Sequence, residues 1–234
     1  MNKCNSIAVI IPAAGVGKRM LSSTPKQYLK IQGKTVLQHT VERFCSLSFV
    51  AKIVIAVSEN DGYIQDLLPK LSSKVTLAIG GKERADSVLA ALKALDNFKY
   101  PWVMVHDAAR PCVLKSDINK LFEQVKRTQR GAILGAPVRD TMKRSDKYNQ
   151  IKHTVEREYL WHAYTPQMFQ TELLAQAIDC HLANQQVITD EASAMELAGY
   201  PVQLVEGSDT NIKITRPQDL TLAQIYLENS NNEN

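Results

Sequence analysis

The stretch that most constrains the fold of this chain is residues 8–20, Ala-Val-Ile-Ile-Pro-Ala-Ala-Gly-Val-Gly-Lys-Arg-Met. An apolar run ends at Pro12, small residues follow it, and two cations come next at Lys18 and Arg19. This order predicts a buried strand that runs into a loop without bulky side chains. Backbone N–H groups of such a loop can approach an anion closely, and nearby cations such as Lys26 neutralise it. The first hypothesis is therefore a nucleoside triphosphate site.

The spacing excludes two common phosphate-binding loops. A P-loop needs four residues between its first glycine and a Gly-Lys-Ser/Thr, but Gly15 and Gly17 are one residue apart. A dinucleotide fingerprint needs a third glycine three positions after the second, where this chain has Met20. An ordinary tight turn between a strand and a helix stays open as the alternative.

Composition indicates one globular domain over residues 1–234, with 44% hydrophobic and 22% charged residues. The net charge of +4 suits a small anionic ligand and is too weak to indicate nucleic acid. Four scattered cysteines without a Cys-x-x-Cys motif indicate free thiols in a reducing cytoplasm. The apolar runs are too short for a signal peptide or a membrane span, so we expect a cytoplasmic protein that contacts no membrane.

Apolar runs typical of strands alternate with helical stripes along the chain. Strands are expected at Ile7–Ile11, Ile53–Val57, Val75–Ile79, Trp102–Val105, Ala132–Val138 and Tyr200–Glu206. Helices are expected at Val36–Phe44, Tyr63–Leu68 (closed by Pro69), from Ala85 or Asp86 to Leu95, at Asp117–Thr128 and Thr171–Asn184, near Thr189, and after Thr215 as an N-cap. The alternation predicts an α/β fold with a mostly parallel sheet, helices on both faces, and a ligand at the carboxyl ends of the strands.

The alternation breaks at residues 139–164, which read as two extended segments about the polar turn Ser145–Asn149. A hairpin of this kind is expected to protrude, and an isolated hairpin is only marginally stable in water. We therefore expect this β-arm to pack on a second subunit and to make a homodimer. The alternative is a surface hairpin packed on its own domain.

Acidic residues suggest a metal site near the loop. Asp107 directly follows a buried strand, and Mg²⁺ in proteins takes one or two carboxylates together with phosphate oxygens. Arg110 is expected to pair with Asp107 or with a phosphate. Asp209 is the second candidate for metal binding. The alternatives are that Asp107 caps the following turn and that Asp209 is a simple turn residue.

The stretch from Gly80 to Ser87 offers a loop for a base and ribose, in which a side chain at Gly80 or Gly81 would block the approach. A Gly-rich turn before a capped helix is the alternative. The five histidines have no zinc-binding spacing, and no Gly-x-Ser-x-Gly motif is present. The sequence therefore favours electrostatic catalysis by cations and a metal over a nucleophilic side chain.

Seven motifs in order, from about Ile7 to Tyr226, resemble the 2-C-methyl-D-erythritol 4-phosphate cytidylyltransferase family. They are Pro-Ala-Ala-Gly-Val-Gly-Lys-Arg-Met, Pro-Lys-Gln-Tyr, Gly-Gly-Lys-Glu-Arg-Ala-Asp-Ser-Val, Val-His-Asp-Ala-Ala-Arg-Pro, Ala-Pro-Val-Arg-Asp-Thr-Met-Lys, Thr-Asp-Glu-Ala-Ser and Asn-Ile-Lys-Ile-Thr-Arg-Pro-Gln-Asp. The resemblance implies transfer of CMP from CTP to 2-C-methyl-D-erythritol 4-phosphate in the non-mevalonate isoprenoid pathway. It also implies a Rossmann-like, glycosyltransferase-A-like nucleotidyltransferase fold, dependence on Mg²⁺, and a homodimer with exchanged β-arms.

The resemblance assigns roles position by position. Arg19 and Lys26 match cations that stabilise the transition state, and Arg157 and Lys213 match residues that hold the substrate phosphate. Thr141 matches an arm residue that reaches the partner's site, and Thr165 and Asp209 are expected to bind the substrate. Ala13, Ala14, Gly15, Gly81 and Ser87 match CTP contacts, and the expected nucleotide site also takes in Pro12, Gly17, Asp107, Ala108 and Arg110.

One departure from the family pattern is Lys82, which stands where some members carry an acidic residue.

Two other functions stay open beside the implied one. A cytidylyltransferase for another alditol phosphate, such as ribitol 5-phosphate, would share the CTP loop and differ in the acceptor pocket. A non-catalytic nucleotide-binding module would not need the full set of cations with Asp107.

Overall fold

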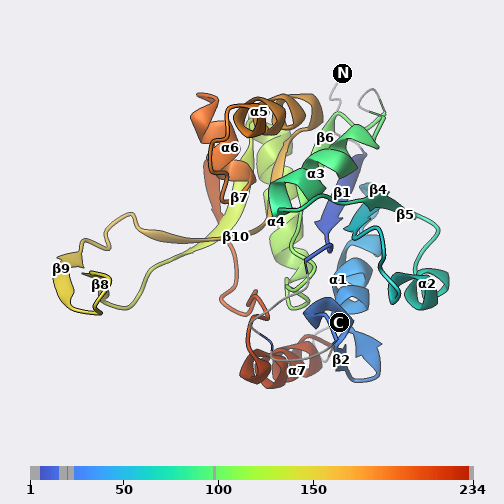
Figure 1. Ribbon diagram of the computed structural model, residues 1–234, viewed down its shortest axis with the longest axis horizontal. Helices are drawn as coiled ribbons and strands as arrows, with labels where there is room; N and C mark the ends of the chain where they lie inside the picture. The colour runs from blue at the N-terminus through green and yellow to red at the C-terminus, as the bar shows by residue number, and fades with distance from the viewer. Residues whose placement is uncertain (1–5, 16–19, 21–23, 97–98, 232–234) are drawn as a thin grey trace.

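The protein forms one central sheet with helices on both faces and an arm that projects from the body (Figure 1). This computed structural model describes residues 6–15, 20, 24–96 and 99–231. The sheet has seven strands in the order β11-β7-β10-β6-β1-β4-β5. They are β1 (Ile7–Pro12), β4 (Val50–Val57), β5 (Val75–Ile79), β6 (Trp102–Val105), β7 (Ala132–Pro137), β10 (Trp161–Gln170) and β11 (Gln203–Glu206).

The helices connect these strands in the alternating order that the sequence predicts. They are α1 (Val36–Cys45), α2 (Ile64–Leu67), α3 (Arg84–Lys93), α4 (Lys115–Thr128), α5 (Thr171–Ala183), α6 (Glu191–Leu197) and α7 (Pro217–Asn231). The described residues also include the 3₁₀ turns η2 (Lys26–Tyr28) and η3 (Leu68–Lys70) and a small hairpin of β2 (Lys30–Ile31) and β3 (Lys34–Thr35). The mostly parallel α/β fold is therefore confirmed.

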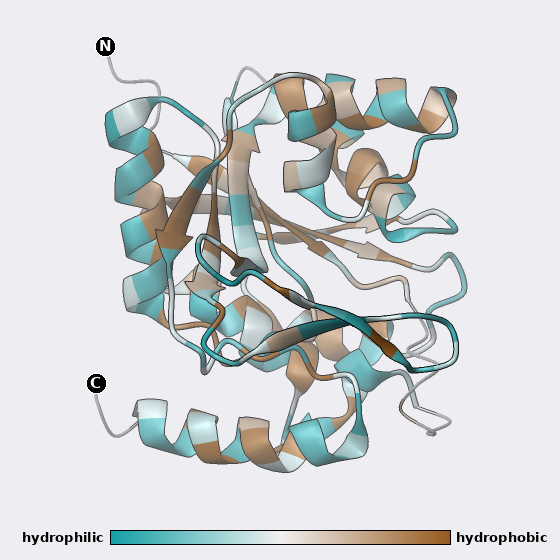
Figure 2. Cartoon of the chain, turned by 90° about the vertical axis from the view of Figure 1, so that its left-hand side faces the viewer, coloured by the Kyte–Doolittle hydropathy of each residue, from teal (hydrophilic) through white to brown (hydrophobic). Residues whose placement is uncertain are grey.

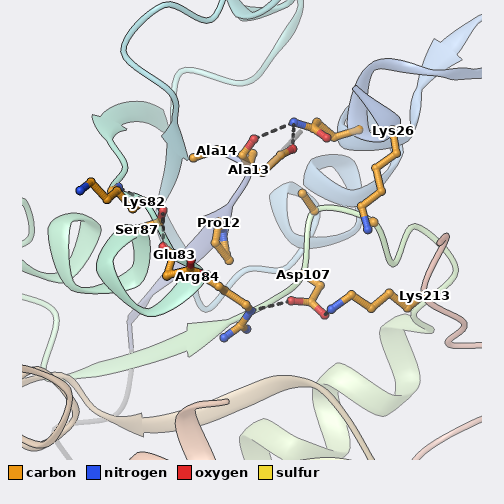
Figure 3. A pocket seen from close by; sticks show the side chains of 15 residues that line it. Pro12, Ala13, Ala14, Lys26, Lys82, Glu83, Arg84, Ser87, Asp107 and Lys213 are labelled. Atoms are coloured by element: carbon orange, nitrogen blue, oxygen red, sulfur yellow. Dashed lines mark hydrogen bonds and ion pairs between the residues drawn. The ribbon is translucent and has the colours of Figure 1, made fainter. Parts of the chain in front are cut away.

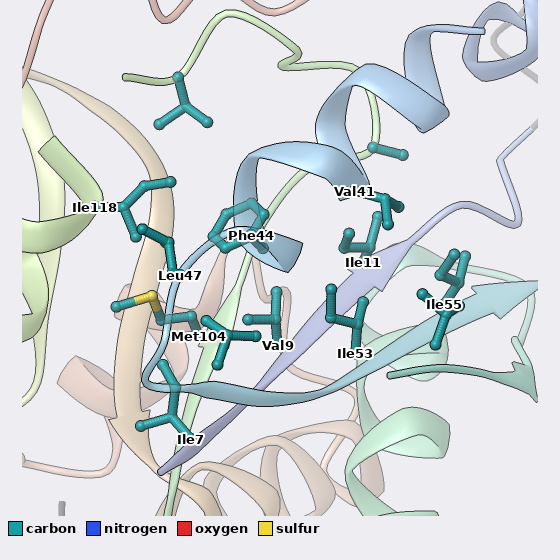
Figure 4. Close-up of a cluster of buried hydrophobic side chains, with 14 of the residues drawn as sticks. Ile7, Val9, Ile11, Val41, Phe44, Leu47, Ile53, Ile55, Met104 and Ile118 are labelled. Atoms are coloured by element: carbon teal, nitrogen blue, oxygen red, sulfur yellow. The ribbon is translucent and has the colours of Figure 1, made fainter. Parts of the chain in front are cut away.

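The alternation of side chains along the strands builds two cores, one on each face of the sheet. Ile7, Val9 and Ile11 of β1 point to one face, where α1 and α4 cover them (Figure 4). Ala8 and Ile10 point to the other face, against α3, α5 and α6. Both rows are fully buried, as expected for a parallel strand covered on both sides. Figure 2 shows the hydrophobic strands lying between the layers of helices.

Strand β10 is the main element that the sequence pattern does not predict. It runs antiparallel to both of its neighbours, β6 and β7, whereas the other pairs described in this sheet are parallel. Its first residues, Trp161–Tyr164, fall inside the range expected for the arm. The pairing with β7 shifts register between Ala163 and Gln167, around Pro166. Polar residues and a proline interrupt the apolar pattern by which a strand is recognised in a sequence. The place of β10 in the sheet is decided by its neighbours instead.

The projecting arm consists of β8 (Met142–Ser145) and β9 (Ile151–Val155), which pair with each other in a separate two-stranded sheet. Residues of both strands are exposed, apart from the half-buried Val155. Asp146 closes the connecting turn by accepting hydrogen bonds from the backbone N–H groups of Tyr148 and Gln150. The hairpin therefore protrudes as expected, and the alternative that it packs on its own domain is wrong.

Three helix boundaries show how local capping decides where a helix begins or ends. The start near Thr189 is confirmed, since Asp190 caps α6 and shares a capping box with Ser193. The expected N-cap at Thr215 is wrong, because α7 begins at Pro217 and the Asp219 carboxylate accepts bonds from both Thr215 and Arg216. Pro69 does not close a helix that reaches Leu68: α2 ends at Leu67, and Pro69 lies within η3.

Within the described residues, none of the helices has the length and apolar character that crossing a membrane requires.

We expect Phe44→Ala to lower the free energy of unfolding by about 3–5 kcal/mol, because it leaves a cavity in the core of Figure 4. The control is Val187→Ala, which removes methyl groups from a side chain that is 83% exposed and should change stability by less than about 0.5 kcal/mol. Urea unfolding at one protein concentration measures both. Equal effects of the two substitutions would show that Phe44 does not stabilise this core.

Candidate functional site

A pocket of about 290 Å³ opens at the carboxyl ends of β1, β5 and β6 (Figure 3). The strand order reverses at β1: the chain passes from β1 to β4 and β5 on one side and then returns to β6 on the other side of β1. Ligands bind at such a switch point in open α/β sheets. The pocket is lined by Pro12, Ala13, Ala14, Gly15, Lys26, Gln27, Gly81, Lys82, Glu83, Arg84, Ser87, Asp107, Ala108, Ala109 and Lys213.

The loop after β1 forms one wall with small side chains only. The Ala13 N–H donates to the Ala56 carbonyl at 2.7 Å, which continues the pairing of β1 with β4. The carbonyl oxygens of Ala13 and Gly15 accept hydrogen bonds from Gln27 Nε2 at 2.7 and 3.0 Å. Both sides of this loop are therefore fixed by hydrogen bonds.

The Gly80-Gly81 turn forms the opposite wall, and the structure gives a different reason for its glycines than the sequence suggests. A Cβ on Gly80 would lie 2.7 Å from Ser87 Oγ and 2.9 Å from Ala14 Cβ, and a Cβ on Gly81 would lie 2.3 Å from Asp86 Cβ. Gly80 thus allows the two walls to approach each other, and Gly81 allows the turn to pack on the first turn of α3. Ser87 Oγ accepts from the Gly81 N–H and donates to the Glu83 carbonyl, so this hydroxyl holds the turn in shape.

The carboxylate of Asp107 forms the charged floor of the pocket. It lies 3.0 Å from Arg84 Nε and 2.8 Å from Lys213 Nζ. Arg110 Nε is 3.5 Å away, within ion-pair distance but without a hydrogen bond. Burial alone would raise the pKa of Asp107, but Arg84, Lys213 and Arg110 outweigh it and hold that pKa well below its usual range. Asp107 is therefore ionised, and its carboxylate pairs with cationic side chains instead of capping a turn.

Arg84 connects this floor to α6. Its guanidinium donates two hydrogen bonds to the fully buried carboxylate of Glu191, at 2.6 and 3.0 Å, while its Nε donates to Asp107. Burial acts to lower the pKa of Arg84, but the carboxylates of Glu191 and Asp107 outweigh it and raise that pKa above its usual range. Glu191 thus offsets one of the cations around Asp107.

A second layer of hydrogen bonds lies below Asp107. Thr165 Oγ1 accepts from the Asp107 backbone N–H at 3.1 Å and lies 3.0 Å from His106 Nδ1. His106 Nε2 lies 3.0 Å from the Arg110 carbonyl. The Arg110 carbonyl can only accept, so Nε2 carries the ring proton and donates to it, and Nδ1 accepts from the Thr165 hydroxyl. Complete burial lowers the pKa of His106 to about 4, so the ring is neutral.

Two lysines bring positive charge into the pocket from distant parts of the chain. Lys26 Nζ donates to the Ile214 carbonyl at 3.0 Å, next to Lys213 in the sequence. In Figure 3, the side chains of Lys26 and Lys213 both point towards the space beside Asp107. An anion in this space would contact both amines.

The structure brings together most, but not all, of the site residues predicted from the sequence. Ten line the pocket: Pro12, Ala13, Ala14, Gly15, Lys26, Gly81, Ser87, Asp107, Ala108 and Lys213. Gly17 and Arg19 lie outside the described residues. Arg110 donates to the Asn211 carbonyl at 2.6 Å behind the pocket, and Thr165 is buried below it. Thr141 and Arg157 belong to the arm and its base, and neither lines the pocket.

Asp209 does not join Asp107. It pairs with Arg139 at 3.1 Å and lines a separate hollow of about 440 Å³ with Asp117, Glu206 and Ser208. Among the residues that the structure describes, no cluster of three or more His, Cys, Asp or Glu side chains could hold a metal by itself. A Mg²⁺ ion in the pocket would have the ionised Asp107 as its carboxylate and would take its other ligands from phosphate oxygens, since this ion needs only one or two carboxylates.

Sequence reasoning missed the roles of Gln27, Arg84 and Glu191, although each lies inside one of the seven motifs. Their position inside these motifs was the signal that could have identified them, because each is a polar or charged residue in a short stretch that already pointed to the site. Lys82, whose role the sequence leaves open, lines the pocket.

Comparison with known proteins places the chain among relatives of one activity. The family model described as "IspD: 2-C-methyl-D-erythritol 4-phosphate cytidylyltransferase" matches residues 7–229. The enzyme of that name from Vibrio vulnificus is 51% identical over 224 residues, 95% of this chain and 94% of its own length. The one from Haemophilus ducreyi is 52% identical over 224 residues, covering 96% and 97%.

Solved structures agree with this result. The 2-C-methyl-D-erythritol 4-phosphate cytidylyltransferase of Francisella tularensis is 38% identical with a TM-score of 0.81, covering 94% of this chain and 99% of the other. The enzyme of Thermus thermophilus is 32% identical with a TM-score of 0.80, covering 95% and 99%.

We expect burial of His106 to make the fold sensitive to mild acid. The pKa is about 6.5 in the unfolded chain and about 4 in the folded one, so the unfolded state binds the extra proton first. The contribution of His106 is therefore complete above about pH 6.5 and is lost as pH falls towards 4, by about 3 kcal/mol in total.

The measurement is urea unfolding at fixed protein concentration from pH 7 to pH 4, for the wild type and His106→Gln. Glutamine keeps a donor and an acceptor but does not titrate. The difference in unfolding free energy should shrink as pH falls. A constant difference would show that His106 is not held neutral by the fold.

Proposed function

The chain belongs to the 2-C-methyl-D-erythritol 4-phosphate cytidylyltransferase family, and on that premise we propose how its pocket works. The enzyme transfers CMP from CTP to 2-C-methyl-D-erythritol 4-phosphate in isoprenoid biosynthesis, giving 4-diphosphocytidyl-2-C-methyl-D-erythritol and diphosphate. The observation that carries the proposal is one pocket that joins a wall of small residues to Lys26, Lys213 and the ionised Asp107.

The reaction needs no nucleophile from the protein. A phosphate oxygen of the sugar phosphate attacks the α-phosphorus of CTP and forms the new O–P bond, while the bond from that phosphorus to the diphosphate oxygen breaks. Attack of one anion on another needs neutralisation and in-line positioning. Lys26 offsets charge at the α-phosphate and the leaving diphosphate, together with Arg19. Lys213 holds the attacking phosphate beside Asp107.

The two walls of the pocket suit the two halves of CTP. The triphosphate lies along Pro12–Gly15, where small side chains let backbone N–H groups come close. The base and ribose lie against the turn at Gly81, which Ser87 holds in shape. Mg²⁺ would be held by Asp107 and by phosphate oxygens, and it would supply further charge neutralisation at the phosphates.

The arm completes the acceptor site of a second subunit in this proposal. It projects from the body of its own chain (Figure 1), none of its residues lines the pocket, and Thr141 and Arg157 are exposed there. Apolar side chains are also exposed on the arm, with Tyr148 at 70% and Ile151 at 66%. A homodimer would cover these groups and bring the Arg157 fork to the sugar phosphate of its partner.

The remaining partners follow from charge and chemistry. We propose a cytoplasmic location, which the free thiols of Cys45, Cys112 and Cys180 support. A net charge of +4 on 234 residues gives no support to a nucleic acid partner. The family match does not favour ribitol 5-phosphate as acceptor, and the cations gathered around Asp107 do not favour a non-catalytic module.

The first test is release of diphosphate from CTP and Mg²⁺ with either 2-C-methyl-D-erythritol 4-phosphate or ribitol 5-phosphate. We expect clear preference for the first acceptor and no turnover after removal of the metal.

Lys26→Ala should lower kcat by about 10²–10³-fold, because it removes one electrostatic contact made in the transition state. Arg157→Ala should mainly raise KM for the sugar phosphate. Preference for ribitol 5-phosphate, or equal effects of Arg157→Ala on both KM values, would contradict the assignment.

Subunit mixing tests the exchanged arm. Lys26→Ala damages the pocket and Arg157→Ala damages the arm, so a mixed dimer would carry both lesions in one site and none in the other. The assay uses sugar phosphate well below the raised KM of Arg157→Ala, where both single variants have little activity. After random exchange half of the dimers are mixed, and the mixture should then recover about a quarter of wild-type activity. Light scattering measures the dimer independently. No recovery in a mixture shown to exchange subunits would place Arg157 in the site of its own chain.

A further inference from the structure

Gln27 is a buried polar side chain at the edge of the nucleotide pocket, only 3% exposed. It lies in the short turn η2, directly after Lys26. Its amide nitrogen donates to the carbonyl oxygens of Ala13 at 2.7 Å and Gly15 at 3.0 Å. A side-chain amide has two N–H donors, so this loop takes both of them.

These two bonds decide which way the loop presents its peptide groups. In a trans peptide the C=O and N–H point in opposite directions. Because the Ala13 carbonyl faces Gln27, the N–H of Ala14 faces away from Gln27. The Ala13 N–H is itself held by the Ala56 carbonyl of β4. The orientation of this part of the loop is therefore set from both sides.

We infer that Gln27 is a positioning residue that turns the carbonyl oxygens of Ala13 and Gly15 away from the triphosphate and leaves the Ala14 N–H towards it. A carbonyl oxygen facing a triphosphate would repel it, whereas an inward N–H attracts it. The inference rests on the proposed function, since it takes CTP as the occupant of this pocket.

The same turn also sets where Lys26 lies relative to the loop. The far side of η2 is fixed by Tyr28, whose hydroxyl donates to Asp61 at 2.7 Å and whose ring stacks on Tyr63 at 5.0 Å. Gln27 fixes the near side, against the loop itself. One 3₁₀ turn therefore joins a catalytic cation to the peptides that bind the nucleotide.

Two substitutions separate this role from simple packing. Gln27→Glu keeps the shape but replaces the amide nitrogen, which carries both donors, by an oxygen that faces two carbonyls. Gln27→Met keeps the length and fills the space without any donor. The matched control is Gln124→Glu, where the half-buried amide donates to Gln203 at 3.0 Å, away from the pocket.

We expect kcat/KM for CTP to fall about 10²-fold in Gln27→Glu, because a misplaced binding group costs about that much. Gln27→Met should lose about tenfold, as two neutral hydrogen bonds are removed. KM for the sugar phosphate should stay within about twofold in both, and Gln124→Glu should match the wild type within about twofold. Titration calorimetry with CTP should show the same order of affinities.

Wild-type affinity and kinetics for CTP in Gln27→Met would overturn the inference. An equal rise of both KM values, with a lower melting temperature, would also overturn it, since that pattern means packing alone. If Gln27→Glu does not fold, Gln27→Met carries the test. Failure of the proposed function looks different: the wild type would release no diphosphate, or Lys26→Ala would keep its kcat, while CTP calorimetry would still decide the role of Gln27.

Discussion

The buried negative charge of Asp107 is the constraint on which the rest of the site depends. Arg84 reaches it from α3, Arg110 from the turn after β6, and Lys213 from the segment before α7. Glu191 adds α6 through Arg84. Removing a partner from a buried charge leaves the other group unpaired, which costs far more than an exposed ion pair is worth. Charge balance at one carboxylate therefore fixes the relative positions of segments that are far apart in the sequence.

The sequence predicts the fold well wherever local pattern controls it. The bounds of β5 and β6 agree residue for residue with the apolar runs, because those runs are short and end sharply, at Gly80 and at His106-Asp107. Strand β10 was not predicted, because its residues follow no strand pattern and its place in the sheet is set by β6 and β7. The start of α7 was predicted wrongly for a similar reason. The Asp219 carboxylate accepts hydrogen bonds from the backbone N–H groups of Thr215 and Arg216, and which polar groups meet at the start of a helix depends on backbone geometry.

The site was predictable as a set of loops but not as a set of contacts. Glycines, small residues and cations after successive strands were enough to predict a pocket at the carboxyl ends of the strands, and the structure has a pocket there. The partners of the polar groups were not predictable, because Arg84 and Glu191 are 107 positions apart and Lys26 contacts a carbonyl 188 positions away. Gly80 and Gly81 show the same difference between sequence and contacts. The sequence pattern indicated that no side chain fits there, and only the packing against Ala14, Ser87 and Asp86 shows why.

The arm meets the body only where β7 ends and where β10 begins, and none of the residues lining the nucleotide pocket belongs to it. This separation has an evolutionary consequence. The arm can change in length or sequence without disturbing the walls that receive the nucleotide. In the proposed dimer, where the arm completes the acceptor site, acceptor choice can therefore diverge between lineages while the nucleotide half is inherited unchanged.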